Sequence, residues 1–275
     1  MNNTFYDPHT YFLAHHGIVG QKWGKRNGPP YPLNASTHNR VVKRGKKVGS
    51  KSSRLFEYDK KTRPDVYKER DSEREKYKKN RSGPLDDKTG LRLKTSYCSM
   101  KEDAKLVNPG FEEGAYGAID SSYNCMFCSA TYESRRRGFD TIAKLSPKPI
   151  SLLNFYKLFP KAKVLSIENY DVTDKNSLGI NIPTRLIKKI KSSSGDGDSR
   201  GIITVYWDPI ITGSSSAHAM NYSVNNNKLH LIDSQSGDVY DEEESYDLLT
   251  NISSAMFFRT DNTEFNDSEM KKYME

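Results

Sequence analysis

The stretch YNCMFCSATYESRRRGFD, residues 123–140, decides the fold of this chain, because it has the pattern of a helix with two cysteines in its first turn. We expect the helix to begin at Cys125 and to run to about residue 137. Gly138 then stands where helices commonly end in a left-handed residue. The arginines at 135–137 hold three consecutive helical positions and so point around most of the helix. We expect this arginine cluster to be structural, with at least one member paired inside the domain.

The elements after this helix predict an α+β fold. A short strand is expected over 139–145, and helices over 151–159 and 183–194, the second opened by Pro183. Four later stretches have the composition of strands: residues 201–207, 217–224, 228–233 and 255–260. An Asn-rich hairpin at 225–227 joins the second to the third. The prediction is an arrangement in which the cysteine helix packs on an antiparallel sheet and a largely extended basic arm precedes both.

Composition divides the chain into four parts. Of 275 residues, 35% are hydrophobic and 28% are charged, which favours one folded domain with polar extensions. Apolar residues are sparse from about 34 to 100 and denser afterwards. We expect an N-terminal segment at 1–33, a basic flexible linker or exposed helix at 34–100, a folded α+β domain at 101–260 and a C-terminal tail at 261–275.

The linker carries the positive charge of the chain. Residues 40–94 contain 20 Lys and Arg against 9 Asp and Glu, an excess of 11, whereas the whole chain has a net charge of +8. Such a segment can bind polyanions by counterion release, so nucleic acid is a candidate partner of residues 40–94. The alternative is a solvated arm, because few aromatic residues are interleaved for stacking on bases. Residues 65–80 have almost no apolar stripe, so any helix there is expected to be exposed.

Three cysteines, at 98, 125 and 128, predict no disulfide framework and indicate a reducing compartment. No run of 18 apolar residues occurs, so the sequence predicts no membrane span. The first residues also lack the charged start, apolar run and cleavage site of a secretory signal. Secretion and membrane insertion are therefore not expected.

The cysteine pair allows three kinds of chemistry. A zinc site needs four ligands, and beyond the single C-x-x-C only Cys98, His218 and His230 are candidates. A dithiol redox motif is expected after a strand in a βαβ unit, whereas the residues before Cys125 look turn-like. A thiol nucleophile explains more, because a cysteine in the first turn of a helix feels the positive end of the helix dipole.

A thiol nucleophile needs a base and a group that orients the base. His218 stands at the start of one expected strand and Asp233 at the end of the next, and a hairpin between these strands would set them side by side. The order of the residues along the chain therefore predicts a triad in which Cys125 attacks. No metal or organic cofactor is required for this chemistry.

These motifs resemble the papain-fold toxin family of glutamine deamidases. The resemblance covers residues 107–239: an Asn-Cys pair opening a helix that ends in Arg-rich residues and Gly, a strand with His, and a strand ending in Asp-x-Gln-Ser-Gly. It implies that Cys125 is the nucleophile, His218 the base and Asp233 the orienting acid, with Gln235 next to the site. It also implies that the substrate is a target protein with a reactive glutamine.

Two details of the site stay open. The helix is similar to that of bacteriocin-processing thiol peptidases, which makes Cys125 the attacking thiol and Cys128 its buried neighbour, but an alignment to plant-type thiol proteases would choose Cys128. We take Cys125, because the first turn gains most from the dipole. Related peptidases have a Gln six residues before the cysteine to complete the oxyanion hole, where this chain has Ile119. The backbone amide of Cys125 is one donor, and Asn124 or Gln235 is the candidate for the second.

A second motif lies within residues 11–33. HHGIVGQKWGKR resembles an HHGxxGQKWGxR motif of structural and head-associated proteins from phages that infect Gram-positive bacteria. The resemblance implies a phage or prophage protein, contact of residues 11–33 with capsid proteins, and a location in the virion or in the bacterial host cytoplasm. His15 and His16 are adjacent and no Cys or acid ligand is near, so a metal site is not expected there.

We therefore expect a papain-like thiol enzyme, a protein glutamine deamidase that serves as a toxin or effector domain. The first alternative is a thiol protease or isopeptidase, which uses the same triad on another carbonyl. The second is an inert, virion-associated structural protein whose basic arm contacts nucleic acid.

Overall fold

The computed structural model describes residues 49–111, 118–146, 150, 155–168, 182–195, 197–207, 217–250 and 252–275; of residues 49–55, 119 and 122 it describes the backbone only. The described residues form a mixed fold of helices and one antiparallel sheet, which confirms the predicted α+β class. The HHGIVGQKWG segment, the start of the linker and part of the helix expected over 151–159 lie outside them. No helix in the described part combines the length and apolar character needed to cross a bilayer.

Six strands form the sheet in the order β1-β6-β2-β3-β4-β5, and every neighbouring pair is antiparallel. They are β1 (Leu165–Glu168), β2 (Ser199–Trp207), β3 (Ala217–Asn225), β4 (Lys228–Asp233), β5 (Asp238–Tyr240) and β6 (Ile252–Arg259). The four strands expected from composition are β2, β3, β4 and β6. The edge strands β1 and β5 were not predicted, because four and three residues are too few to show a pattern. The strand expected over 139–145 is wrong: Phe139 and Ala143 make only isolated bridges.

The β3–β4 hairpin sets the geometry of the site. Asn226 and Asn227 both have left-handed backbone conformations, with φ of 50° and 59°. Asparagine tolerates this conformation, and a two-residue turn of this kind matches the twist of the strands it joins. Because Asn225 pairs with Lys228, the start of β3 and the end of β4 lie at the same end of the sheet.

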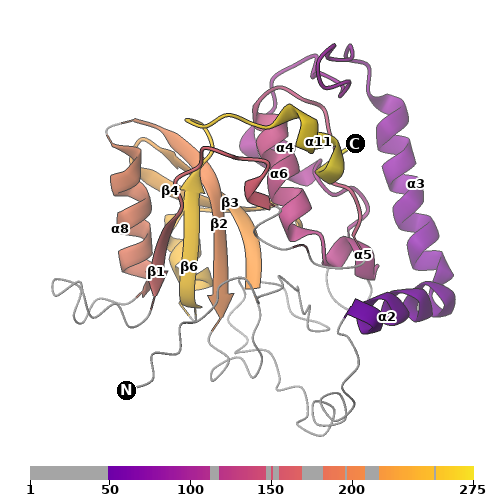
Figure 1. Ribbon diagram of the computed structural model, residues 1–275, viewed down its shortest axis with the longest axis horizontal. Coiled ribbons are helices and arrows are strands. Elements are labelled where there is room, and N and C mark those ends of the chain that lie inside the picture. Colours follow the sequence, from indigo (N-terminus) through magenta and orange to yellow (C-terminus); the bar gives the residue numbers. More distant parts are fainter. Residues whose placement is uncertain are drawn as a thin grey trace, which may run out of the picture.

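Helix α6 (Cys125–Arg136) lies on one face of the sheet (Figure 1). Every residue from Cys125 to Arg135 is buried. Phe127 and Tyr132 belong to the same apolar core as Phe258 of the sheet. Gly138 follows the helix with a φ of 97°, which confirms the predicted helix end.

The opposite face of the sheet is covered by α8 (Ile182–Ser194) and α10 (Glu242–Leu248). Figure 1 shows α8 and α6 on opposite sides of the strands. Leu186 and Ile190 of α8 form a second apolar core with residues of the sheet such as Val205. The sheet is thus buried on both faces, and the helix expected over 183–194 is confirmed.

Two helices, α2 (Gly49–Thr62) and α3 (Pro64–Asn80), lie in the described part of the basic linker, so the arm is helical there and not largely extended as expected. In Figure 1, α3 lies outside α6. The expectation of an exposed helix does not hold for one face of α3, where Arg70 and Arg74 are buried. Arg70 forms an ion pair with Asp120, and Arg74 donates to the carbonyl oxygen of Ala143 at 2.6 Å. Hydrophobic periodicity could not predict this face, because arginines make its contacts.

The C-terminal residues are also part of the folded body, whereas the sequence predicted a tail at 261–275. Helix α11 (Asp267–Tyr273) packs beside α6, and the rings of Tyr273 and Phe127 lie 5.4 Å apart. Met270 and Met274 are fully buried in the same core. The core on this side of the sheet therefore closes with the last residues of the chain.

The arginine cluster at the end of α6 makes structural contacts, as predicted. Arg135 and Arg136 both form ion pairs with Asp103 of α4 (Met100–Lys105), at 3.1 and 3.0 Å. Arg137 pairs with Glu133 at 2.7 Å. These carboxylates are buried, so the arginines supply the charge that burial of each acid requires.

Candidate active site

Cys125 is the first residue of α6 and is 1% exposed. Asn124 holds the N-cap position, but its side chain makes no capping bond to the helix. The backbone N–H groups of the first turn are therefore not taken by that side chain, and they carry the positive end of the helix dipole. Such a helix start stabilises negative charge on a sulfur or on an oxyanion beside it.

His218 and Asp233 meet at the end of the sheet that the β3–β4 hairpin defines. His218 is the second residue of β3, and Asp233 is the last of β4. His218 Nε2 lies 2.9 Å from Asp233 Oδ2, and the two residues are 3% and 4% exposed. The other carboxylate oxygen, Oδ1, accepts the backbone N–H of Gln235 at 3.0 Å. Hydrogen bonds to both oxygens fix the carboxylate against the ring.

The side chain of Cys125 also acts on the ring of His218, whose pKa it raises. Asp233 uses Nε2, so Nδ1 is the ring nitrogen that is left for the thiol. The ring of Trp207 stacks on the imidazole, with 6.4 Å between the centroids and 27° between the planes. The structure therefore brings Cys125, His218 and Asp233, the three residues singled out from the sequence, into one site.

Opposing influences act on the pKa of His218. Burial lowers it, because desolvation disfavours the charged ring, whereas the charge and hydrogen bond of Asp233 raise it, and so does Cys125. The balance raises the pKa from 6.5 to about 10. A ring that is protonated at neutral pH can stabilise a neighbouring thiolate and can donate a proton to a leaving group.

We expect the ring of His218 to keep its proton well above the pH at which an ordinary histidine loses it. The ring nitrogen shifts, followed by NMR from about pH 6 to about pH 10, measure this directly. Because the folded-state pKa exceeds the unfolded value of 6.5, the protonated ring stabilises the fold fully below that pH and loses this contribution as the pH rises toward about 10. Deprotonation at the ordinary pH would show that Asp233 does not hold the proton on the ring.

Cys128 lies one turn further along α6 and is fully buried. Burial raises the pKa of its thiol well above 9.0, and the nearby Cys125 and Asp233 act in the same direction. Cys128 is therefore a neutral thiol that packs in the core. These surroundings favour Cys125 over Cys128 as the reactive thiol.

Asn124 and Gln235 lie beside the site, but their amide hydrogens are already used. Gln235 Nε2 donates to the carbonyl oxygen of Ser121 at 2.7 Å and to Asn124 Oδ1 at 3.0 Å. Asn124 Nδ2 donates to Asn108 Oδ1 at 3.2 Å and to the carbonyl oxygen of Lys144 at 3.4 Å. Neither side chain has a hydrogen left for an oxyanion in this arrangement. The role of second oxyanion donor, expected from the sequence, does not fit their contacts.

Asn108 is a site residue that the sequence did not single out. It is 6% exposed and reaches the carbonyl oxygen of Gln235, 127 positions later in the chain, at 3.3 Å. The signal in the sequence was only an Asn before Pro and Gly, which is typical of any turn. A contact over this separation appears only after folding.

The segment before Cys125 forms a short helix, α5 (Ile119–Ser122), where a turn was expected. Ile119 begins it, at the position of the Gln in related peptidases. The oxyanion donors that the described residues offer are thus the backbone N–H groups at the start of α6. In the same described part of the chain, no three His, Cys, Asp or Glu side chains gather in a way that could hold a metal ion.

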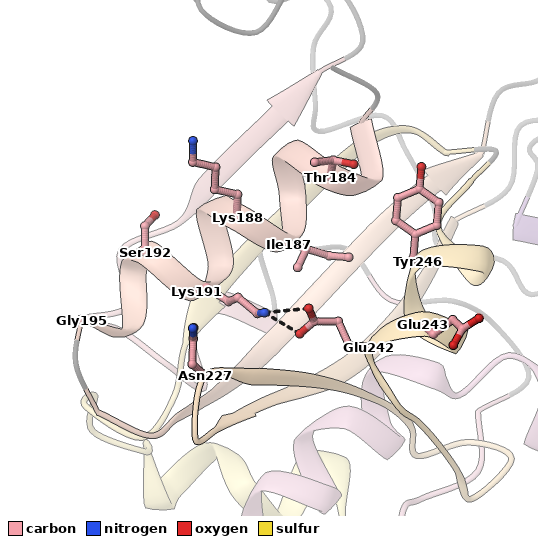
Figure 2. Close-up of a pocket in the computed structure, with 10 residues that line it drawn as sticks. All are labelled: Thr184, Ile187, Lys188, Lys191, Ser192, Gly195, Asn227, Glu242, Glu243 and Tyr246. Atoms are coloured by element: carbon pink, nitrogen blue, oxygen red, sulfur yellow. Dashed lines mark hydrogen bonds and ion pairs between the residues drawn. The ribbon is translucent and has the colours of Figure 1, made fainter. Parts of the chain in front are cut away.

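A groove of about 880 Å³ lies on the other face of the sheet, between α8, the β3–β4 hairpin and α10 (Figure 2). The ion pair between Lys191 and Glu242, at 2.5 Å, lies along it. Cys125, His218 and Asp233 do not line this groove. The groove is therefore separate from the candidate active site.

Comparison with known proteins finds one weak structural similarity. No protein-family model and no curated protein matches the chain. Among solved structures, the chain is similar to the R161 variant of the Salmonella effector SpvD, with 20% identity and a TM-score of 0.33. The similarity covers 62% of this chain and 83% of that one. At this identity and TM-score, the similarity gives no information about the chemistry of the site.

Proposed function

We propose that Cys125, His218 and Asp233 form the active site of a papain-like thiol hydrolase, and that its reaction is the deamidation of a glutamine on a target protein. The hydrogen bond between His218 and Asp233, with Cys125 at the start of α6 close enough to act on the same ring, carries this proposal. A thiol with an adjacent base, and a third group that orients the base, is what activates a cysteine nucleophile. The resemblance of residues 107–239 to papain-fold deamidases supports the choice of glutamine.

In the first half of the reaction, the Cys125 thiolate forms a bond to the side-chain carbonyl carbon of glutamine. The carbonyl oxygen becomes an oxyanion, which the backbone N–H groups at the start of α6 stabilise. When the C–N bond breaks, protonated His218 gives its proton to the nitrogen, so ammonia leaves and a thioester remains.

In the second half, neutral His218 takes a proton from water as the water oxygen attacks the thioester. The C–S bond breaks, glutamate is released, and the thiolate and the protonated ring are restored. Asp233 stabilises the charged ring and holds its orientation in both halves. Glutamine and water are consumed, and glutamate and ammonia are formed.

The experiment that tests this function compares the protein with its Cys125→Ala variant in bacterial and eukaryotic cell lysates. Deamidation predicts ammonia release and conversion of specific glutamines to glutamate, the latter seen by mass spectrometry of tryptic peptides, and both only with the unsubstituted protein. New chain ends or released isopeptide partners without ammonia would favour the protease or isopeptidase alternative. Equal conversion by both proteins would exclude Cys125 from the reaction.

The inert, virion-associated alternative predicts something different. Cys125 would then react with iodoacetamide no faster than Cys98 at neutral pH. Contact of residues 11–33 with phage capsid proteins, and a virion or host-cytoplasm location, are compatible with either function. This contact and this location are proposed only because the HHGIVGQKWG segment resembles the phage motif.

The basic arm has less charge to offer to nucleic acid than its composition suggests. Four of its arginines are bonded to protein groups: Arg63 to Asp59, Arg70 to Asp120, Arg74 to Glu275, and Arg81 to the carbonyl oxygen of Asp140. Binding of a polyanion by residues 40–94 would therefore depend on the other cations of the segment. It stays a secondary proposal, for which the salt dependence of binding is the measurement.

A further inference from the structure

Three buried amide side chains connect the segment that carries Asp233 to the residue before Cys125. They are Asn108, Asn124 and Gln235, which are 6%, 0% and 2% exposed. Asn124 donates to Asn108 at 3.2 Å, Gln235 donates to Asn124 at 3.0 Å, and Asn108 Nδ2 donates to the carbonyl oxygen of Gln235 at 3.3 Å. Each member thus contacts the other two. We name this group the amide cluster.

The carbonyl oxygen of Ser121 ties the amide cluster to α5. It accepts hydrogen bonds from Gln235 Nε2 at 2.7 Å and from Asn108 Nδ2 at 3.4 Å. Asp120, the neighbour of Ser121, forms a buried ion pair with Arg70 of α3. The amide cluster is therefore hydrogen-bonded to α5, and α5 is joined to α3 by an ion pair.

The N-cap position of α6 provides an independent sign that the cluster matters. An Asn in this position usually caps its helix and thereby stabilises the protein. Asn124 makes no such bond, and its side chain instead joins Asn108, Gln235 and Lys144. Helix α6 therefore has no side-chain cap at its start, and the Asn124 side chain is hydrogen-bonded instead to Gln235 in the turn after Asp233.

Movement of that turn would be transmitted to the imidazole. The backbone N–H of Gln235 binds one oxygen of Asp233 at 3.0 Å, and His218 binds the other at 2.9 Å. A shift of the turn would leave buried amides without hydrogen-bond partners, which is unfavourable because each buried polar group would then lack the bonds it makes with water in the unfolded chain. The amide cluster thus opposes any displacement of the carboxylate relative to the start of α6.

We propose that the amide cluster positions the Asp233–His218 pair relative to Cys125, and that Asn108 is its central positioning residue. This inference rests on the proposed function of the site. Asn108 acts through Asn124 and Gln235 and has no contact with the reacting atoms. Misplacement of a catalytic group by about 1 Å costs on the order of 100-fold in rate, so loss of Asn108 is expected to lower kcat and to leave KM nearly unchanged.

Two variants remove the cluster, and one serves as a matched control. Asn108→Ala deletes the central amide, and Gln235→Met deletes both Nε2 donations at similar volume. Thr260→Val also deletes a buried hydrogen bond, from Thr260 Oγ1 to Glu133 at 2.9 Å, but two turns away from Cys125 along α6. It reports the effect of a generally less stable fold.

Two measurements report the placement of His218 and need no substrate: the titration of its ring and the alkylation rate of Cys125. Among the described residues, Asp233 from β4, Cys125 from α6 and the ring of Trp207 from β2 act on His218. In both cluster variants we expect the His218 ring to lose its proton at lower pH than in the unsubstituted protein, because its pairing with Asp233 is weakened. Alkylation of Cys125 by iodoacetamide near about pH 6 should slow by roughly 10- to 100-fold. Thr260→Val should change neither readout.

An Asn108→Ala variant whose His218 titrates as in the unsubstituted protein would overturn the proposal. If that variant does not fold, Gln235→Met decides the question by the same titration. Failure of the proposed function looks different: Cys125 of the unsubstituted protein would be alkylated no faster than Cys98, while the titration of His218 would still report whether the cluster places Asp233.

Discussion

Replacement of Cys125 by alanine is expected to lower kcat about a millionfold, because loss of a nucleophile removes the covalent route altogether. The free energy of unfolding should fall by on the order of 1 to 3 kcal/mol, because Cys125 is 1% exposed and loss of its thiol leaves a small cavity in the core. Ammonia release from a target protein measures the first quantity, and urea unfolding measures the second. The fold must be shown to persist, so that loss of activity reports chemistry alone.

Cys128→Ala is the matched control within the same helix. Cys128 is fully buried in the core, so its loss should leave a small cavity that costs on the order of 1 to 3 kcal/mol of stability. Activity should remain, because the raised pKa of this thiol keeps it neutral and Cys125 keeps its place beside His218. The opposite pattern, with Cys128→Ala inactive and Cys125→Ala active, would show that the alignment to plant-type thiol proteases is the correct one.

Asp233→Asn is expected to lower kcat by about 10⁴-fold, the loss seen when a triad carboxylate becomes an amide of the same shape. The amide has no charge to stabilise the protonated ring, and Asp233 is a main cause of the raised pKa of His218. The alkaline limb of the pH–rate profile should therefore move to lower pH in any activity that remains. A profile of kcat against pH measures both effects.

Asp238→Asn tests the same substitution a few residues further along. Asp238 is exposed and accepts a hydrogen bond from Ser236 at 2.9 Å, with no contact to His218. Its rate and pH profile should match those of the unsubstituted protein. Equal losses in the two variants would mean that the turn is sensitive to any change of charge, and the role of Asp233 as orienting acid would be lost.

The sequence predicted those parts of the fold that short-range physics dictates. The helical pattern with its terminal Gly138 predicted α6, Pro183 predicted the start of α8, and strand-like composition predicted β2, β3, β4 and β6. The Asn-rich turn made β3 and β4 a hairpin. Because a hairpin places the start of one strand beside the end of the next, the proximity of His218 and Asp233 followed from the sequence as well.

Tertiary structure alone decided the contacts that polar groups make over long separations. Arg70 forms an ion pair with Asp120, fifty positions away, and Arg74 forms one with Glu275. Asn108 donates a hydrogen bond to the carbonyl oxygen of Gln235. In the sequence, these residues look like any solvated arginine or turn asparagine, because a buried hydrogen bond has no period along the chain. Local preferences therefore determined which elements form and where the thiol, imidazole and carboxylate stand on them. The packing of distant polar partners determined how the arm, the C-terminal helix and the amide cluster hold those elements together.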